Sequence, residues 1–145
     1  MIRKILVGVD GSPASNAALA WVTELARSLS AEVVALHSLG LLAPDYAGQL
    51  VPTERHRQAI IDEFEQRWCR PLAEAGIRYK PVVVDGNPVS AILVVGAEER
   101  VDLVVLGSRG HKVTSDVLGS TSHQVAERAC CPVVIIPPKR DEPLL

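Results

Sequence analysis

The 145-residue sequence has few aromatic residues, 3% of the chain, and only three cysteines. With so few aromatic side chains, the core must be built from the aliphatic residues that dominate the 48% hydrophobic fraction. An aliphatic core of this kind suits buried parallel strands covered by helices. The cysteines show no CxxC or Cys/His ligand spacing, and adjacent Cys130 and Cys131 do not easily meet disulfide geometry. We therefore expect buried, reduced thiols.

An excess of positive charge and a long apolar run are also missing. The formal net charge of −2 argues against a nucleic-acid-binding surface. No apolar run reaches the length of a membrane span, and residues 1–4 lead into a short strand without the apolar stretch of a signal peptide. These absences predict a cytoplasmic protein that binds neither nucleic acid nor membrane. The length fits one domain, which we expect at residues 1–138, followed by a loose tail at residues 139–145.

Short apolar runs alternate along the chain with segments of helical periodicity. A loop of roughly fifteen residues, longer than most connections, follows the second run. The strands are predicted at residues 5–9, 32–37, 77–84, 101–106 and 132–137, and the helices at residues 13–29, about 53–76, 87–97 and 122–128.

Proline and glycine mark several boundaries of these elements. Ser12-Pro13 and Asn87-Pro88 each provide a helix cap followed by proline at the first helical position. Pro71 is expected to kink or end the second helix nearby, and Gly76 to stop it. Pro81 favours an edge position for the third strand, because proline cannot donate to a central ladder.

Five strands alternating with four helices predict a doubly wound, Rossmann-like α/β domain. Its five-stranded parallel sheet is expected in the order 3-2-1-4-5, with helices on both faces. Ligands bind such sheets at the carboxyl ends of the strands where the winding reverses, here between the first and fourth strands. Val9-Asp10-Gly11 and residues 107–110 would then face each other.

A glycine-bearing loop lies between the fourth strand and the last helix. It begins with Gly107-Ser108-Arg109-Gly110 and continues, after eight residues, with Gly119-Ser120-Thr121. A strand, a glycine-bearing loop and a helix N-terminus together present unpaired N–H groups to an anion. Glycine lets the backbone come close to a phosphate. The pattern predicts a nucleotide or phosphate site.

The sequence resembles the universal stress protein family over essentially its whole length. The resemblance is carried by residues 5–12, 101–110, 119–120 and 131–137. It implies an adenine nucleotide alpha hydrolase-like fold, a homodimer and, in the nucleotide-binding group, an ATP-binding regulatory module of the stress response. That group has the pattern Gly, two residues, Gly, nine residues, Gly, then Ser or Thr. Here the second gap has eight residues, which removes up to about 3.5 Å of reach.

The resemblance also implies a role for each site residue. Asp10 would accept hydrogen bonds from the ribose hydroxyls, and the backbone of Ser38 would meet adenine. Gly8 and Val9 would line the sugar–base pocket, and Leu106 would pack on the base. The phosphates, with Mg²⁺ in the case of ATP, would meet Gly107, Gly110, Gly119, Ser120 and Thr121, with positive charge from Arg109, His111 and Lys112.

No catalytic motif of the GxxxxGK[ST], GxSxG or HExxH type is present. We therefore assign no catalytic residue and expect nucleotide hydrolysis to be slow at most. We expect no metal centre built from protein side chains: His37 is interpreted as a hydrogen-bonded structural histidine, and His111 and His123 lack a third ligand. The alternative role for Asp10 is to cap the turn beside Gly11.

Two other function classes remain open. The first is a family member that binds no nucleotide and serves as a dimerisation module, pairing through Val133–Ile136 across a two-fold axis. The second is a receiver-type signalling domain, in which Asp85 after the third strand would be the phosphoacceptor. Only Asp10 of the expected acidic pair is present for that role, and Lys139 follows the last strand at some distance.

Overall fold

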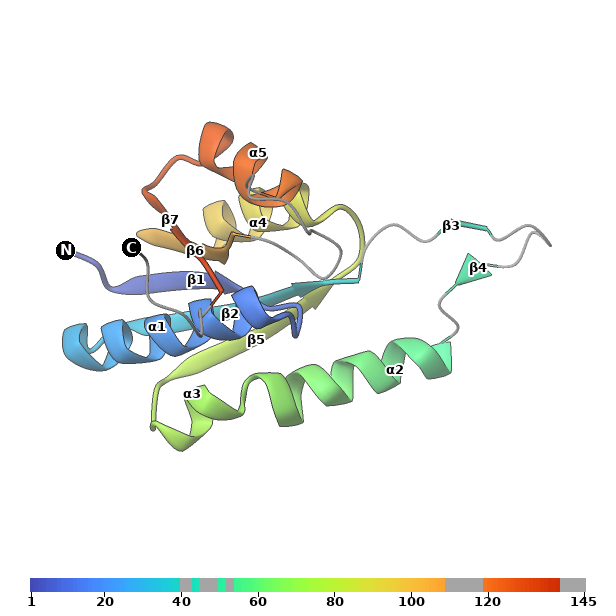
Figure 1. Ribbon diagram of the computed structural model, residues 1–145, viewed down its shortest axis with the longest axis horizontal. Helices are drawn as coiled ribbons and strands as arrows, with labels where there is room; N and C mark the ends of the chain where they lie inside the picture. Colours follow the sequence, from blue (N-terminus) through green and yellow to red (C-terminus); the bar gives the residue numbers. More distant parts are fainter. Residues whose placement is uncertain (40–42, 45–49, 52–53, 109–118, 139–145) are drawn as a thin grey trace, which may run out of the picture.

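The computed structural model describes residues 1–39, 43–44, 50–51, 54–108 and 119–138. A five-stranded, all-parallel sheet in the order β5-β2-β1-β6-β7 forms its centre (Figure 1). Counted within this sheet, the order is 3-2-1-4-5, so the predicted fold is confirmed. The strands are β1 (Lys4–Gly8), β2 (Glu32–Ser38), β5 (Tyr79–Val84), β6 (Leu103–Gly107) and β7 (Val133–Ile136).

Helices cover both faces of the sheet, as the sequence predicts. Figure 1 shows α1 and α3 on one side of the strands, and α4 and α5 on the other. The helical elements are α1 (Pro13–Leu29), α2 (Glu54–Glu63), the π-helix η1 (Phe64–Trp68), α3 (Arg70–Glu74), α4 (Pro88–Glu98) and α5 (Ser120–Arg128).

Successive side chains of each central strand enter two different cores. Ile5 and Val7 pack in the cluster shared with α1, η1 and α3, whereas Leu6 packs in the cluster shared with α4 and α5. This follows from the two-residue period of a strand. Burial on both faces explains why the strands are continuous apolar runs.

The predicted helix starts and the predicted edge strand are confirmed. Ser12 caps α1 by accepting a hydrogen bond from the N–H of Ser15 at 3.2 Å, and Asn87 caps α4 through Val89 N at 2.8 Å. Pro81 lies in β5, which is an edge strand.

The second helical segment breaks just before Pro71. Proline has no N–H to donate to the residue four positions earlier, and its ring crowds that carbonyl. The chain widens into the π-helix η1, in which Cys69 N donates to Phe64 O at 3.0 Å, and α3 follows. Gly76, at φ +70°, ends α3 as predicted.

Most element boundaries lie within two residues of the predicted ones, and two differences have a structural explanation or a new element behind them. The connection after β2 contains a short antiparallel pair, β3 (Ala43–Pro44) and β4 (Leu50–Val51), which no sequence pattern indicated. Helix α5 begins at Ser120, two residues earlier than predicted. The reason is the hydrogen bond from Gly119 N to Ser108 O, which holds Gly119 in extended backbone as the N-cap of α5.

The three cysteines differ in exposure. Cys69 is fully buried, and burial together with nearby Glu65 raises the pKa of its thiol to about 12. Cys131 is half-buried, and burial raises the pKa of its thiol as well. The expectation of buried thiols is wrong for Cys130, which is exposed because it lies in the bend between α5 and β7. Among the described residues, no helix is both long and apolar enough to cross a membrane.

Candidate functional site

The ends of β1 and β6 lie side by side at the centre of the sheet, where the winding reverses. Val7 of β1 is in register with Val105 of β6. One residue further along β1, a Cβ added to Gly8 would lie 2.8 Å from Leu106 Cδ2. The Leu106 side chain therefore packs over the backbone of Gly8, and these two candidate residues come together as expected.

Asp10 organises the turn that follows β1. Its Oδ1 accepts a hydrogen bond from Ser12 N at 2.8 Å, and its own N–H donates to Ser15 Oγ at 3.0 Å. Ser15 Oγ in turn donates to Gly8 O at 3.4 Å. The turn-capping role is thus present. A carboxylate has about four acceptor positions, so capping a turn is compatible with accepting further hydrogen bonds.

Both backbone polar groups of Val9, its N–H and its carbonyl, are hydrogen-bonded. Its N–H donates to Leu36 O at 2.8 Å, and its carbonyl accepts a hydrogen bond from His37 Nδ1 at 2.7 Å. Because a carbonyl oxygen only accepts, this bond requires the proton of the imidazole to be on Nδ1. His37 also packs against the rings of Phe64 and Trp68. The prediction that His37 is a structural, hydrogen-bonded histidine is confirmed.

Ser38 ends β2 on the other side of β1. Its hydroxyl donates to Gly86 O at 2.6 Å, and the N–H of the next residue, Leu39, donates to Val84 O at 2.9 Å. The serine side chain therefore ties β2 to the exit of β5.

Gly107 is required by the packing of α1. A Cβ at this position would lie 2.7 Å from the carbonyl carbon of Ala14 and 2.9 Å from its oxygen. The Gly107 carbonyl accepts a hydrogen bond from Ser122 Oγ of α5 at 2.6 Å. Gly107 thus brings the starts of α1 and α5 against the same strand end.

The N-terminus of α5 is held directly beside the end of β6. Gly119 N donates to Ser108 O at 2.7 Å, so this N–H already has an acceptor within the protein. Gly119 has no side chain to cap the helix, and the first intrahelical bond, from His123 N to Gly119 O, leaves the preceding N–H groups outside the ladder. This uncapped end carries the positive pole of the helix dipole.

The same hydrogen bond bears on the shortened glycine motif. Ser108 and Gly119 are joined at the base of the connection, so the number of residues between them does not set the distance between β6 and α5. Arg109 and Gly110, with His111 and Lys112, lie outside the described residues.

The hydroxyl of Ser108 lies at this base. The residue is 7% exposed, and within the described ranges Ser108 Oγ is a buried side-chain oxygen without a hydrogen-bond partner. Native proteins contain few such groups. No sequence pattern distinguished this serine from others near the motif.

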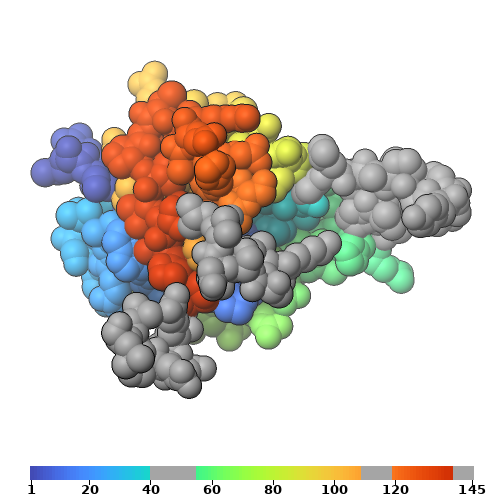
Figure 2. Space-filling view, turned by 45° about the horizontal axis from the view of Figure 1, so that its top comes forward, coloured from blue at the N-terminus to red at the C-terminus, as the bar shows by residue number. Residues whose placement is uncertain are grey.

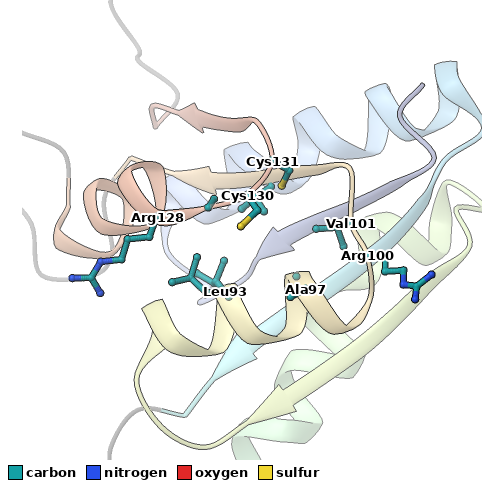
Figure 3. A pocket seen from close by; sticks show the side chains of 11 residues that line it. Leu93, Ala97, Arg100, Val101, Arg128, Cys130 and Cys131 are labelled. Atoms are coloured by element: carbon teal, nitrogen blue, oxygen red, sulfur yellow. The ribbon is translucent and has the colours of Figure 1, made fainter.

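A separate cavity of about 220 Å³ lies between α4 and α5, near the amino-terminal ends of β6 and β7. Leu93, Ala97 and Cys130 line it, while the guanidinium groups of Arg100 and Arg128 point away from it (Figure 3). It is at the opposite end of β6 from Gly107. No group of three or more metal-ligating side chains occurs in the described ranges.

The sheet order contradicts the receiver-type alternative. Asp85 follows β5, an edge strand separated from β1 by β2. In receiver domains the third strand lies next to the first, so that its acidic end faces the first strand's. Asp85 is instead paired with Arg57 of α2, and Lys139 lies outside the described residues.

The fold and this site define a doubly wound α/β domain with a helix N-terminus at its switch point, where the N-cap Gly119 has no side chain to cap the helix. A family model described as the universal stress protein family matches residues 1–137. The chain therefore belongs to the universal stress protein family, as its sequence resemblance indicated.

Individual relatives agree with this assignment. The chain is 31% identical to universal stress protein YxiE of Bacillus subtilis, over 94% of this chain and 99% of the relative. It is similar to the structure of universal stress protein UspA from Lactobacillus plantarum, with a TM-score of 0.74, 25% identity and coverage of 93% and 97% of the two chains. A universal stress protein in complex with cAMP has the same fold, with a TM-score of 0.69, 24% identity and coverage of 95% and 98%.

Proposed function

We propose that this chain binds an adenine nucleotide at the carboxyl ends of β1, β2 and β6 and acts as a cytoplasmic, nucleotide-responsive regulatory module of the stress response. The observation that carries the proposal is the start of α5, which has no side-chain cap among the described residues and is anchored beside the switch point by Gly119 N and Ser122 Oγ. The N-terminus of a helix binds anionic groups through its unpaired backbone N–H groups. The structural neighbour in complex with cAMP supports an adenine nucleotide as the ligand.

The nucleotide is oriented by groups on three strands. The ribose hydroxyls donate to Asp10, the backbone of Ser38 meets adenine, and Gly8, Val9 and Leu106 line the pocket. The phosphates lie near Gly107 and the first turn of α5, at Ser120 and Thr121. Arg109, Gly110 and Gly119 complete the motif, and ATP brings Mg²⁺ through its phosphates. No residue of this arrangement is assigned to catalysis.

The direct test is to denature the purified protein and identify released nucleotide by mass spectrometry, followed by calorimetric titration with ATP, AMP and cAMP. A bound nucleotide at 100 times its dissociation constant adds about 2.7 kcal/mol of stability, which a thermal shift detects. Absence of released nucleotide, together with no heat and no shift at millimolar concentrations, would refute the proposal.

Asp10→Asn isolates the carboxylate of the ribose contact. The amide oxygen still accepts the hydrogen bond from Ser12 N, so we expect the turn and the melting temperature to be kept. Loss of the charged acceptor is expected to weaken nucleotide binding by about tenfold, as for a hydrogen bond to a charged group. Asp62→Asn, on the exposed side of α2, is the matched control and should bind as the wild type does. Equal affinities of the two variants would contradict the assignment.

A homodimer through β7 is the second part of the proposal. β7 is an edge strand, and all four of its apolar residues are only half-buried in the monomer. Figure 2 shows the segment of α5 and β7, orange to red, at the surface of the molecule. Pairing with a second copy would cover both its edge and these side chains. A dimer of this kind is also how a family member without nucleotide would serve as an assembly module.

Val134→Lys tests this interface. A lysine in the middle of β7 should give a monomer by sedimentation velocity, because its charge would be buried against the partner strand. Val94→Lys, an equivalent change at an exposed position of α4, should leave the assembly unchanged. A dimer that persists in folded Val134→Lys protein would exclude β7 as the interface.

A further inference from the structure

Ser108 faces α5 rather than α1. Successive side chains of an extended strand point to opposite faces. The Cβ position of Gly107 points into Ala14 of α1. Ser108 directly follows this last residue of β6, and its N–H still donates to Ile136 O of β7 at 2.8 Å. Its side chain therefore lies on the other face, together with Leu106 and the start of α5.

The Ser108 hydroxyl stands out among the buried hydroxyls of the described chain. Ser12 Oγ accepts from Ser15 N, Ser15 Oγ donates to Gly8 O, Thr23 Oγ1 donates to Leu19 O, and Ser122 Oγ donates to Gly107 O. Ser108 Oγ alone in this set has no partner in the part of the chain that the structure describes. Burying a hydroxyl without a hydrogen-bond partner opposes folding. The packing of the protein without ligand therefore does not explain why a serine is present at position 108.

The groups around Ser108 favour an anionic hydrogen-bond acceptor for its hydroxyl. Its carbonyl is bonded to Gly119 N, the residue that caps α5, so the hydroxyl lies beside the uncapped first turn of that helix. Ile136, Gly119 and Ser122, which bond to Gly107 and Ser108, carry no acidic side chain. A hydroxyl and helix N–H groups together form a set of donors, and a phosphate oxygen is the acceptor that uses both.

We propose that Ser108 is a phosphate-recognition residue, whose Oγ donates a hydrogen bond to a phosphate oxygen of the bound nucleotide. This assignment rests on the proposed function and deepens it. It makes the site selective for phosphorylated ligands over the free nucleoside, and it adds a side-chain donor from the second position of the glycine motif to the backbone donors of α5.

The test compares Ser108→Ala with Ser122→Ala in the absence and presence of ligand. Without ligand, Ser108→Ala removes an unsatisfied group, so its melting temperature should equal or exceed that of the wild type. Ser122→Ala removes a formed hydrogen bond and should melt at a lower temperature. A fall in the melting temperature of Ser108→Ala as large as that of Ser122→Ala would overturn the proposal, because it would mean that the hydroxyl has a structural partner.

With ligand, titration calorimetry with ATP and with adenosine separates the phosphate from the nucleoside. Ser108→Ala should bind ATP roughly ten- to hundredfold more weakly than the wild type, the range for a hydrogen bond to a charged group. Adenosine should bind both proteins equally, or neither. Unchanged ATP affinity, or an equal loss for adenosine, would overturn the assignment of Ser108 while leaving nucleotide binding intact. A wild-type protein that binds neither ligand would instead refute the proposed function itself, and the assignment with it.

Discussion

Replacing Phe64 with alanine is expected to lower the free energy of unfolding by about 3–5 kcal/mol, the range for truncating a buried aromatic side chain. Phe64 is 0% exposed and is the largest of the fully buried side chains in the described ranges. Its ring centroid lies 5.9 Å from that of His37 and 6.3 Å from that of Trp68. The surrounding sheet and helices hold these neighbours in place, so the cavity cannot collapse fully.

Urea denaturation followed by far-ultraviolet circular dichroism measures this loss, and Phe64→Leu is the control. Leucine keeps most of the apolar volume, so its loss should be clearly smaller than that of alanine. A change below about 1 kcal/mol for Phe64→Ala would mean that η1 is not a fixed part of the core.

Phe64→Ala is also expected to affect the candidate site. Phe64 packs against His37, and His37 holds the carbonyl of Val9 at the end of β1. Looser packing of the imidazole should weaken nucleotide binding even where the protein is still folded. Calorimetry at low temperature, where the variant remains native, separates this effect from unfolding. Unchanged affinity would indicate that the end of β1 is positioned without His37.

Gly107→Ala is expected to destabilise the protein by about 1–3 kcal/mol, the usual penalty for overpacking. The added Cβ would lie 2.7 Å from the carbonyl carbon of Ala14. This atom belongs to the backbone of α1, so no side-chain rotation can relieve the contact. The start of α1 must move, and it carries Ser15, whose hydroxyl accepts the hydrogen bond from Asp10 N. Nucleotide binding should therefore weaken as well.

Gly96→Ala is the matched control for this change. Gly96 lies in α4, and an added Cβ would have its nearest contact 3.5 Å away, at Val101 Cγ2. Alanine is favoured over glycine in a helix by up to about 1 kcal/mol, so this variant should be as stable as the wild type or more so. If Gly107→Ala proved equally neutral by thermal and urea denaturation, the close approach of α1 to β6 would be wrong.

Most of the fold was predictable because its causes are local or periodic. Runs such as residues 33–36 are apolar throughout, which indicates strands buried on both faces. The Ser12-Pro13 pair marks a helix start without reference to the rest of the chain. The edge position of β5 followed from Pro81 alone. The region of the site was predictable for a related reason: parallel strands bring their carboxyl ends to one edge of the sheet, where Asp10 and Gly107 both occur.

Other features depend on contacts between distant segments, and the sequence carried no signal for them. The short β3–β4 pair and the exposure of Cys130 belong to this group. The sequence suggested that position 107 is glycine so that a phosphate can approach the backbone. In the structure, Ala14 of α1 leaves no room for a side chain at this position.

The sequence by itself determined the element order, the doubly wound class and the family, because hydrophobic period, caps and glycine spacing are written along the chain. The tertiary structure decided how the glycine motif is assembled. The bond from Gly119 N to Ser108 O fixes α5 beside β6, so the shortened gap does not separate the two ends of the site. The tertiary structure also decided which serine hydroxyls have a hydrogen-bond partner, because donors and acceptors pair only once packing brings their segments together. Ser108 is left without a partner in the described structure for that reason, and it can be recognised only there.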